Sequence, residues 1–238
     1  MPLFFSLYNW LRGTIFHPQW LSDRFHIRAK KKLPALEKCT ILDIGSGNSN
    51  NSRYLSGSNR VFRLDYPATN IRYAALPEIF GDACALPVKE AEIDVVFFFE
   101  VLEHVLDYKK ALQEIHRVLK SGGKLYISVP FIYPVHDAPY DFRRFTIHGL
   151  RVILNDHHFT VKQEVQYGNS FLVALQLMNL ALLETGKNLC ESNALCGILF
   201  SALAYPLCLL NNLLALPLTF LSPKSASCFG YLVIAERN

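Results

Sequence analysis

Residues 39–47 read Cys39-Thr-Ile-Leu-Asp-Ile-Gly-Ser-Gly47, and this stretch decides the fold. A short apolar run that ends in two glycines is typical of a buried strand followed by a tight turn, because glycine adopts left-handed backbone at no steric cost. Further short apolar runs follow along the chain and alternate with helical stretches. This alternation predicts a doubly wound, mostly parallel α/β sheet, which binds ligands beyond the carboxyl ends of its strands.

The pattern of apolar residues sets the expected elements. The expected strands are Cys39–Ile44, Arg60–Leu64, Glu78–Phe80, Ile93–Phe99, Lys124–Val129, Phe159–Gln166 and Phe229–Ala235. Two helices are expected, Tyr108–Lys120 and Thr146–His157, with N-caps at Asp107 and Thr146. Gly122 follows the first helix and ends it. The last two strands have no ordinary amphipathic helix between them, so we expect them to pair antiparallel at the sheet edge.

Composition narrows the class of protein. The 238 residues are 51% hydrophobic with a net charge of +4, which suits one α/β domain with an elaboration. Part of the positive charge sits in one cluster, Arg24, Arg28 and Lys30–Lys32, so we expect no nucleic-acid partner. The six cysteines form no C-x-x-C pair and have no metal-site spacing, which predicts reduced thiols in a cytosolic protein and no metal. No secretory signal stands out at the N-terminus.

Carboxylates lie at the ends of three of the expected strands. Asp65 can accept hydrogen bonds from both hydroxyls of a ribose, and Asp82 in Gly81-Asp82-Ala83 can accept one from an adenine amino group. A nicotinamide dinucleotide site would instead need a third glycine where Asn50 stands, and Asp43 would repel its phosphates. Each aspartate alone could equally be a turn former or a helix cap.

Two more stretches complete the pattern: Phe99-Glu100-Val-Leu-Glu103-His104-Val105 and the helix end Ile115–Gly123. Together with the glycine turn, the chain resembles the class I S-adenosylmethionine-dependent methyltransferases of the type-11 kind, over residues 39–166 and the closing strand. The resemblance implies a seven-stranded sheet of order 3-2-1-4-5-7-6 with strand 7 antiparallel, and S-adenosylmethionine as cofactor. It places the methionine part of the cofactor at the glycines, the ribose at Asp65 and the adenine at Asp82. The cofactor site that we expect from these motifs comprises Asp43, Gly45, Gly47, Asp65, Asp82, Ala83 and Glu100. Ser46 departs from the family, which often has Cys there; the change is conservative.

The segment from Pro130 to Thr146 is less generic. It is similar to a bacterial methyltransferase subgroup with the pattern P-x-x-x-P-x-H-x-x-P-x-D-x-x-R-x-T, which we associate with cell-surface glycan loci. That similarity favours a saccharide acceptor.

The same segment supplies the expected acceptor chemistry. An alcohol acceptor must lose its proton as it attacks, and His136, just beyond the fifth strand, is the first candidate base. His104 is the second; alternatively, it begins a helix and His136 only bonds its loop. Asp141, Arg143 and Arg144 could clamp a sugar or an anionic headgroup, or could pair with one another.

Residues 169–227 interrupt the connection between the last two strands. Everything from Ser192 to Pro223 is uncharged, which exceeds the roughly 20 residues of a membrane span. Pro206, Pro217 and Asn211-Asn212 are expected to break this run, which favours an interfacial or re-entrant helical hairpin. The alternative is packing over the active site or a homodimer interface. The expected organisation is therefore an aromatic and basic N-terminal segment (1–35), a methyltransferase domain (36–168 and 228–238) and an apolar insertion (169–227).

The sequence thus predicts a cytoplasmic methyltransferase with peripheral contact to the inner face of the membrane. We expect O-methylation of a small-molecule, saccharide or lipid-linked acceptor. One alternative is methylation of a lipid-soluble small molecule such as a quinone precursor. Others are a non-catalytic S-adenosylmethionine-binding partner subunit and, more distantly, a dehydrogenase.

Overall fold

The computed structural model describes residues 11, 13–31, 33–47, 51, 58–69, 76–220 and 226–238. Lys32, Asn50 and four aromatic residues of the N-terminal segment lie outside the described residues: Phe4, Phe5, Tyr8 and Trp10. The chain forms two compact units. Unit 1 comprises the described residues up to Ala29, Ile132–Pro134 and Gln166–Phe229, and unit 2 comprises Lys30–Phe131, Val135–Val165 and Gly230–Asn238. Most of the predicted methyltransferase domain is unit 2, whereas the predicted N-terminal segment and apolar insertion fall mainly into one unit.

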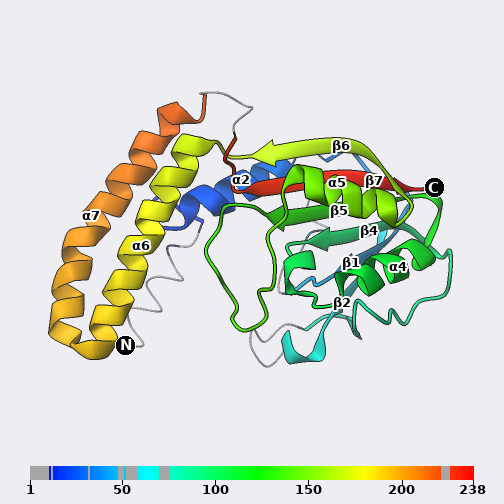
Figure 1. Cartoon of the computed structure of the whole chain (residues 1–238), viewed down its shortest axis with the longest axis horizontal. Coiled ribbons are helices and arrows are strands. Elements are labelled where there is room, and N and C mark those ends of the chain that lie inside the picture. Colours follow the sequence, from blue (N-terminus) through cyan, green and yellow to red (C-terminus); the bar gives the residue numbers. More distant parts are fainter. Residues whose placement is uncertain are drawn as a thin grey trace. The chain divides into compact units, whose positions relative to one another are not determined.

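Unit 2 is built on a seven-stranded sheet (Figure 1). Its strands are β1 (Thr40–Ile44), β2 (Arg60–Asp65), β3 (Ile79–Phe80), β4 (Ile93–Phe99), β5 (Leu119–Pro130), β6 (Phe159–Tyr167) and β7 (Gly230–Arg237). The strand order is β3-β2-β1-β4-β5-β7-β6, as predicted. β1 to β5 pair in parallel with their neighbours, and β7 pairs antiparallel to β5 with Tyr126 opposite Ile234. The switch in strand order lies between β1 and β4, so ligands are expected at the carboxyl ends of these strands.

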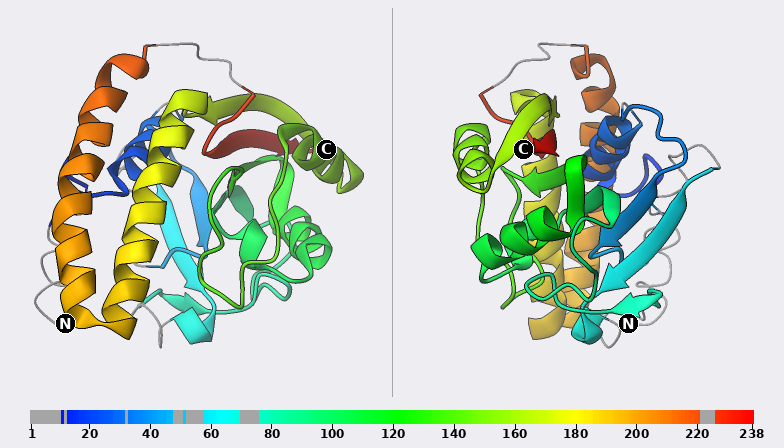
Figure 2. Two further views of the ribbon diagram at one scale, coloured as in Figure 1. Left: turned by 60° about the vertical axis from the view of Figure 1, so that its left-hand side comes forward. Right: turned by 90° about the vertical axis from the view of Figure 1, so that its right-hand side faces the viewer.

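The strands alternate their side chains between the two faces of the sheet. Leu42 and Ile44 of β1, with Val96 and Phe98 of β4, belong to one buried apolar cluster. The helices α4 (Tyr108–Val118) and α5 (Ile147–Asp156) contribute their buried side chains to the same cluster, so they cover the same face of the sheet (Figure 2). Asp43 has the opposite parity in β1 and therefore points to the other face.

The caps of the two helices confirm the sequence prediction. The Asp107 carboxylate accepts a hydrogen bond from the backbone nitrogen of Lys110, and the Thr146 hydroxyl accepts one from Gly149. The predicted end of α4 was late by two residues. The helix ends at Val118, because Leu119 is already extended and pairs with Ile93 at the start of β5.

Unit 1 contains α2 (Trp20–Lys30, of which Lys30 lies in unit 2) and an antiparallel pair of long helices, α6 (Ser170–Ser192) and α7 (Ala194–Leu218). Asn193 joins the pair and caps α7 by accepting a hydrogen bond from Cys196 N. The two helices approach closely at this end, since a side chain at Gly197 would lie 2.3 Å from Cys190 Sγ. The hairpin was predicted, but the breaks within it were not found: α7 continues through both Pro206 and Pro217.

The paired asparagines of α7 have a different role from the predicted break. Asn212 Nδ2 donates to the backbone oxygens of Ile15 and His17, and its Oδ1 accepts from Asn179 of α6. Asn211 Nδ2 donates to Asn179 Oδ1 over 2.8 Å. All three asparagines are buried. Buried amides need such partners, so this network fixes the helix pair to the N-terminal segment of the same unit.

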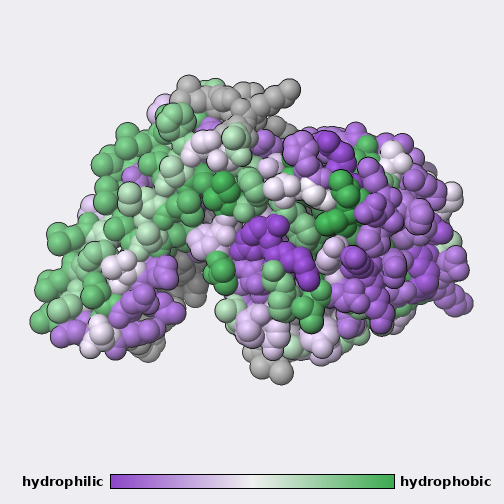
Figure 3. Space-filling model, in the orientation of Figure 1, coloured by the Kyte–Doolittle hydropathy of each residue, from purple (hydrophilic) through white to green (hydrophobic). Residues whose placement is uncertain are grey.

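The remaining face of α7 is apolar and exposed. Leu199, Leu203 and Leu210 are 58%, 79% and 49% exposed, and Figure 3 shows apolar side chains covering the helix pair. Among the described helices, α7 alone is long and apolar enough to cross a membrane by length and composition. Only 22% of its most apolar window is buried, which sets it apart from the core helix of a soluble domain.

Candidate active site

The glycine turn after β1 is shaped by two left-handed residues. Gly45 has φ +70° and Gly47 has φ +51°, a region that costs any L side chain about 1–2 kcal/mol. A side chain at Gly45 would also lie 2.3 Å from Val101 Cγ2, whereas among the described residues one at Gly47 would meet only the Asp65 carboxylate, at 4.0 Å. Within the described part of the chain, the turn is therefore closed on the Gly45 side by Val101 and open at Gly47, where a ligand can approach the backbone.

Asp65 at the end of β2 is aimed at this turn. Its Oδ2 accepts a hydrogen bond from Gly47 N at 2.6 Å, and its Oδ1 accepts one from Tyr66 N at 2.7 Å. Ser46, between the two glycines, is buried, and its hydroxyl has no hydrogen-bond partner among the described residues. A buried hydroxyl without a partner is costly, so a ligand atom here would satisfy it. These residues fit the predicted cofactor.

Asp43 lies on the face of the sheet away from α4 and α5. Its carboxylate accepts two hydrogen bonds from Asn51 Nδ2, and Asn51 Oδ1 in turn accepts one from Lys30 Nζ. Burial raises the pKa of Asp43 to about 6, although the bond from Asn51 and the nearby Lys30 ammonium oppose the rise. Lys30 is itself buried, with its ammonium 4.5 Å from the centre of the Phe99 ring. Lys30 is therefore not a surface member of the basic cluster that the sequence shows at Arg24, Arg28 and Lys30–Lys32.

The other three predicted cofactor residues, Asp82, Ala83 and Glu100, make contacts mainly with their own turns or neighbouring strands. Asp82 is exposed and its Oδ1 accepts a hydrogen bond from Cys84 N, which is a turn-forming contact, and Ala83 beside it is buried. Glu100 follows β4 with φ +56°, a strained conformation for a glutamate, and its nitrogen donates to Ser128 O. Contacts of these three with a cofactor stay a prediction.

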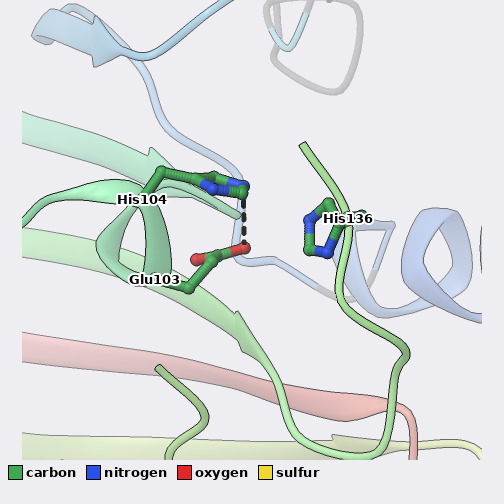
Figure 4. Close-up of side chains that lie close together, drawn as sticks. All are labelled: Glu103, His104 and His136. Carbon is green, nitrogen blue, oxygen red and sulfur yellow. Dashed lines mark ion pairs between the residues drawn. The ribbon is translucent and has the colours of Figure 1, made fainter. Parts of the chain in front are cut away.

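The structure brings both predicted catalytic histidines together. Their ring centres are 4.8 Å apart with the rings edge to face, and Figure 4 shows both facing Glu103. Nδ1 of His104 lies 2.8 Å from Tyr140 O, and Nδ1 of His136 lies 3.1 Å from Asp141 Oδ2. Burial lowers the pKa of His104, so it is neutral around pH 7. His104 Nδ1 faces the Tyr140 carbonyl, so the lone pair of the neutral His104 ring is on Nε2. His136 Nδ1 faces the Asp141 carboxylate and, at 3.4 Å, also the Arg144 guanidinium; in the tautomer that donates from Nδ1 to Asp141, the lone pair of His136 is on Nε2.

Asp141 and Arg144 pair with each other, the alternative that the sequence left open. Both oxygens of Asp141 accept from the guanidinium, and Oδ2 also accepts from His136 N. Although burial opposes it, these bonds lower the pKa of Asp141 to about 2. Arg143 turns away and donates to the carbonyls of Val105 and Leu106. Its guanidinium thus stabilises the turn that precedes α4. Contact of Asp141, Arg143 and Arg144 with the substrate stays a prediction.

Glu103 is the site residue that sequence reasoning missed. Its side chain is fully buried, and neither carboxylate oxygen has a hydrogen-bond partner among the described residues. Burial, reinforced by the nearby Glu100, raises the pKa of Glu103 well above its ordinary value. The only signal in the sequence was its place beside His104, because burial of a short 3-10 turn (Leu102–His104) cannot be read from periodicity.

Comparison with known proteins supports the reading of unit 2. Residues 42–127 match the sequence model of a family described as "Methyltransferase domain". The chain is 31% identical over 96 residues to a "Probable S-adenosylmethionine-dependent methyltransferase" of Mycolicibacterium smegmatis, covering 38% of this chain and 37% of that protein. It is 29% identical over 110 residues to a demethylmenaquinone methyltransferase of Mycolicibacterium vanbaalenii, covering 44% of this chain and 48% of that one. A crystal structure of an S-adenosylmethionine-dependent methyltransferase from Mesorhizobium loti superposes with a TM-score of 0.54 at 16% identity, over 92% of this chain and 98% of that chain.

The strand order and the glycine turn thus give the chain the Rossmann-like fold of the class I methyltransferases. The match of residues 42–127 to a methyltransferase domain, together with the relatives named above, supports S-adenosylmethionine as the cofactor. The family match lies within the part of unit 2 that carries β1 to β5. The chain spans less than half the length of the two curated relatives.

Proposed function

We propose that this protein transfers a methyl group from S-adenosylmethionine to a hydroxyl of a saccharide or membrane-associated acceptor. The observation that carries the proposal is the edge formed by β1 and β2. There, the Asp65 carboxylate and the buried Ser46 hydroxyl lie around the glycine turn, and no described residue bonds to this hydroxyl or closes the turn at Gly47. Asp65 would accept the ribose hydroxyls, and the turn would border the methionine part of the cofactor.

The histidines supply the acceptor chemistry. When bound, S-adenosylmethionine would supply the methyl carbon: its bond to sulfur would break as the bond to the acceptor oxygen forms, with the electron pair returning to sulfur. The acceptor proton passes to His136 Nε2, while Asp141 accepts the hydrogen bond of Nδ1–H and stabilises the charged ring. Arg144 holds Asp141 in the orientation this requires.

A lipid-soluble acceptor such as a quinone precursor is the second candidate. It is supported by the similarity to the demethylmenaquinone methyltransferase and by the apolar surface of α7. The saccharide proposal rests instead on the pattern from Pro130 to Thr146, whose His136, Asp141 and Arg144 are gathered into one contact network.

Replacing the base tests this chemistry. His136→Ala should lower turnover by roughly a hundredfold or more, because general-base catalysis contributes that much, and should leave cofactor affinity nearly intact. His148→Ala is the matched control, since this histidine is exposed on α5. If His136→Ala retains full turnover while His104→Ala abolishes it, the base is His104.

We further propose that the protein works at the cytoplasmic face of the membrane, with α7 lying in the interface. Three exposed leucines of this helix, Leu199, Leu203 and Leu210, support the proposal. Burying each of them in lipid would yield about 1.5–3 kcal/mol. Arg24, Arg28 and Lys31 remain as basic residues near the N-terminus that can meet anionic lipid.

Vesicle flotation tests this location. The full chain should float with anionic vesicles, and the double variant Leu203→Glu/Leu210→Glu should float much less. Val152→Glu, at an equally exposed apolar position on α5, is the control and should float like the parent. A parent chain that stays unbound and forms a homodimer in the absence of detergent would mean that α7 is a subunit interface.

A further inference from the structure

Three side chains of unit 2 surround one point. Glu103, His104 and His136 each offer a ligand atom, and these atoms all lie within 4.8 Å of one another. His104 Nε2 is 3.7 Å from Glu103 Oε1. Figure 4 shows the carboxylate and both rings directed toward the same space, from the 3-10 turn after β4 and from the segment after β5.

The outer partners of the histidines orient both rings for coordination. Tyr140 O lies 2.8 Å from His104 Nδ1, and Asp141 Oδ2 lies 3.1 Å from His136 Nδ1. A carbonyl or carboxylate on the far nitrogen holds the proton there and leaves the near nitrogen as a ligand, which is the usual second shell of a metal-bound histidine. Arg144 anchors Asp141 in turn, so this second shell is itself held in place.

Glu103 is the independent sign of a missing cation. Its carboxylate is fully buried, and neither oxygen has a hydrogen-bond partner among the described residues. A buried carboxyl group is stable only when it is neutralised or paired. A divalent ion bound by all three groups would neutralise this carboxylate and give its oxygens a partner.

We propose that Glu103, His104 and His136 bind a divalent first-row transition-metal ion. Two imidazoles and one carboxylate suit Zn²⁺, Mn²⁺, Fe²⁺ or Co²⁺. Ligands about 2.1 Å from a tetrahedral ion are about 3.4 Å apart, so the cluster must contract by roughly 1 Å on binding. Three protein ligands leave a position open, as in catalytic rather than structural metal sites.

The open position gives the ion a role that rests on the proposed methyl transfer. An acceptor hydroxyl bound there would be acidified, and its proton would pass to water, so the metal-bound form would not need His136 as the base. Binding of the ion itself does not depend on methyl transfer.

The test is a titration of the full chain with Mn²⁺, followed by the loss of the electron paramagnetic resonance signal of the free ion. Mn²⁺ is the probe because it prefers oxygen and nitrogen ligands to the six free thiols of this chain. We expect about one ion bound per chain. Glu103→Gln and His136→Ala should each weaken binding by at least about a hundredfold, since even an outer-shell change typically costs 10- to 100-fold. His148→Ala should bind as the parent does.

Binding of S-adenosylhomocysteine, measured on the same samples, separates this proposal from the proposed function. A parent chain that binds S-adenosylhomocysteine but not Mn²⁺ would overturn the metal site and leave the proposed function standing. A parent chain that binds Mn²⁺ but not S-adenosylhomocysteine would overturn the proposed function and leave the metal site standing. Equal Mn²⁺ binding by folded Glu103→Gln and by the parent would also refute the site, and circular dichroism establishes that the variant is folded.

Discussion

Replacing Asp65 with alanine tests the cofactor site. The carboxylate accepts backbone hydrogen bonds from Gly47 at 2.6 Å and from Tyr66 at 2.7 Å. A bond to a charged acceptor contributes about 1.5–3 kcal/mol, and water can reach the exposed Tyr66, so the two together contribute about 3 kcal/mol to folding. Loss of the ribose contacts should cost about 1–3 kcal/mol more in cofactor binding, which is roughly a 5- to 150-fold rise in Kd.

Calorimetry with S-adenosylhomocysteine measures the Kd, and chemical denaturation measures the stability. Asp65→Asn separates the two effects, because its amide oxygen can still accept from Gly47 but the side chain has lost its charge. Asp156→Ala, at an exposed position of α5, should change neither quantity. Folded Asp65→Ala that binds S-adenosylhomocysteine as tightly as the parent, or a parent chain that prefers NAD, would refute the reasoning.

Two further predictions concern β1 and its turn. Gly45→Ala should destabilise the protein by about 3 kcal/mol in thermal unfolding, because alanine is strained in left-handed backbone and its side chain would clash with Val101. Adding Val101→Ala to the same chain should restore only the part of the stability that the clash removes. A Gly45→Ala variant with an unchanged Tm would contradict this geometry. Burial raises the pKa of Asp43 to about 6, so between pH 4 and 6 the folded state binds more protons than the unfolded state, and stability should fall by about 3 kcal/mol as the pH rises. Urea unfolding at pH 4.5 and pH 7 measures this loss of stability, and Asp43→Asn should remove it. If Asp43→Asn loses as much stability between the two pH values as the control Asp156→Asn, then Asp43 does not titrate in this range.

The positions of the strands could be predicted from the sequence, because they depend on local patterns of residues. The β-branched and aromatic run Ile93–Phe99 cannot be an amphipathic helix, and Gly45 and Gly47 could only form a turn, so the strand positions followed from the residues alone. The strand order came from the resemblance, and the pairing of β7 with β5 agrees with it. The end of α4 was predicted too late because the apolar pattern continues through Leu119, where strand pairing with Ile93 outweighs it.

Burial and partnership of polar groups were beyond the sequence, because they depend on residues far apart in the chain. The sequence predicted a helix break at Asn211 and Asn212, whereas in the structure Asn211 donates to Asn179 and Asn212 donates to the carbonyl of His17 within a continuous helix. Lys30 looked like a surface charge until Asn51 was found to hold it.

For the candidate active site, too, part could be predicted from the sequence and part depended on the tertiary structure. The sequence by itself determined which side chains stand at the ends of which strands, since Asp65 ends β2, and His104 and His136 come after β4 and β5. Only the tertiary structure decided what those side chains do. It placed Asp141 beside His136, and it buried Glu103 beside His104 with no hydrogen-bond partner among the described residues. Spacing along a chain sets the order of residues, whereas their chemistry depends on distances and on exclusion of water, which arise only when the strands pack.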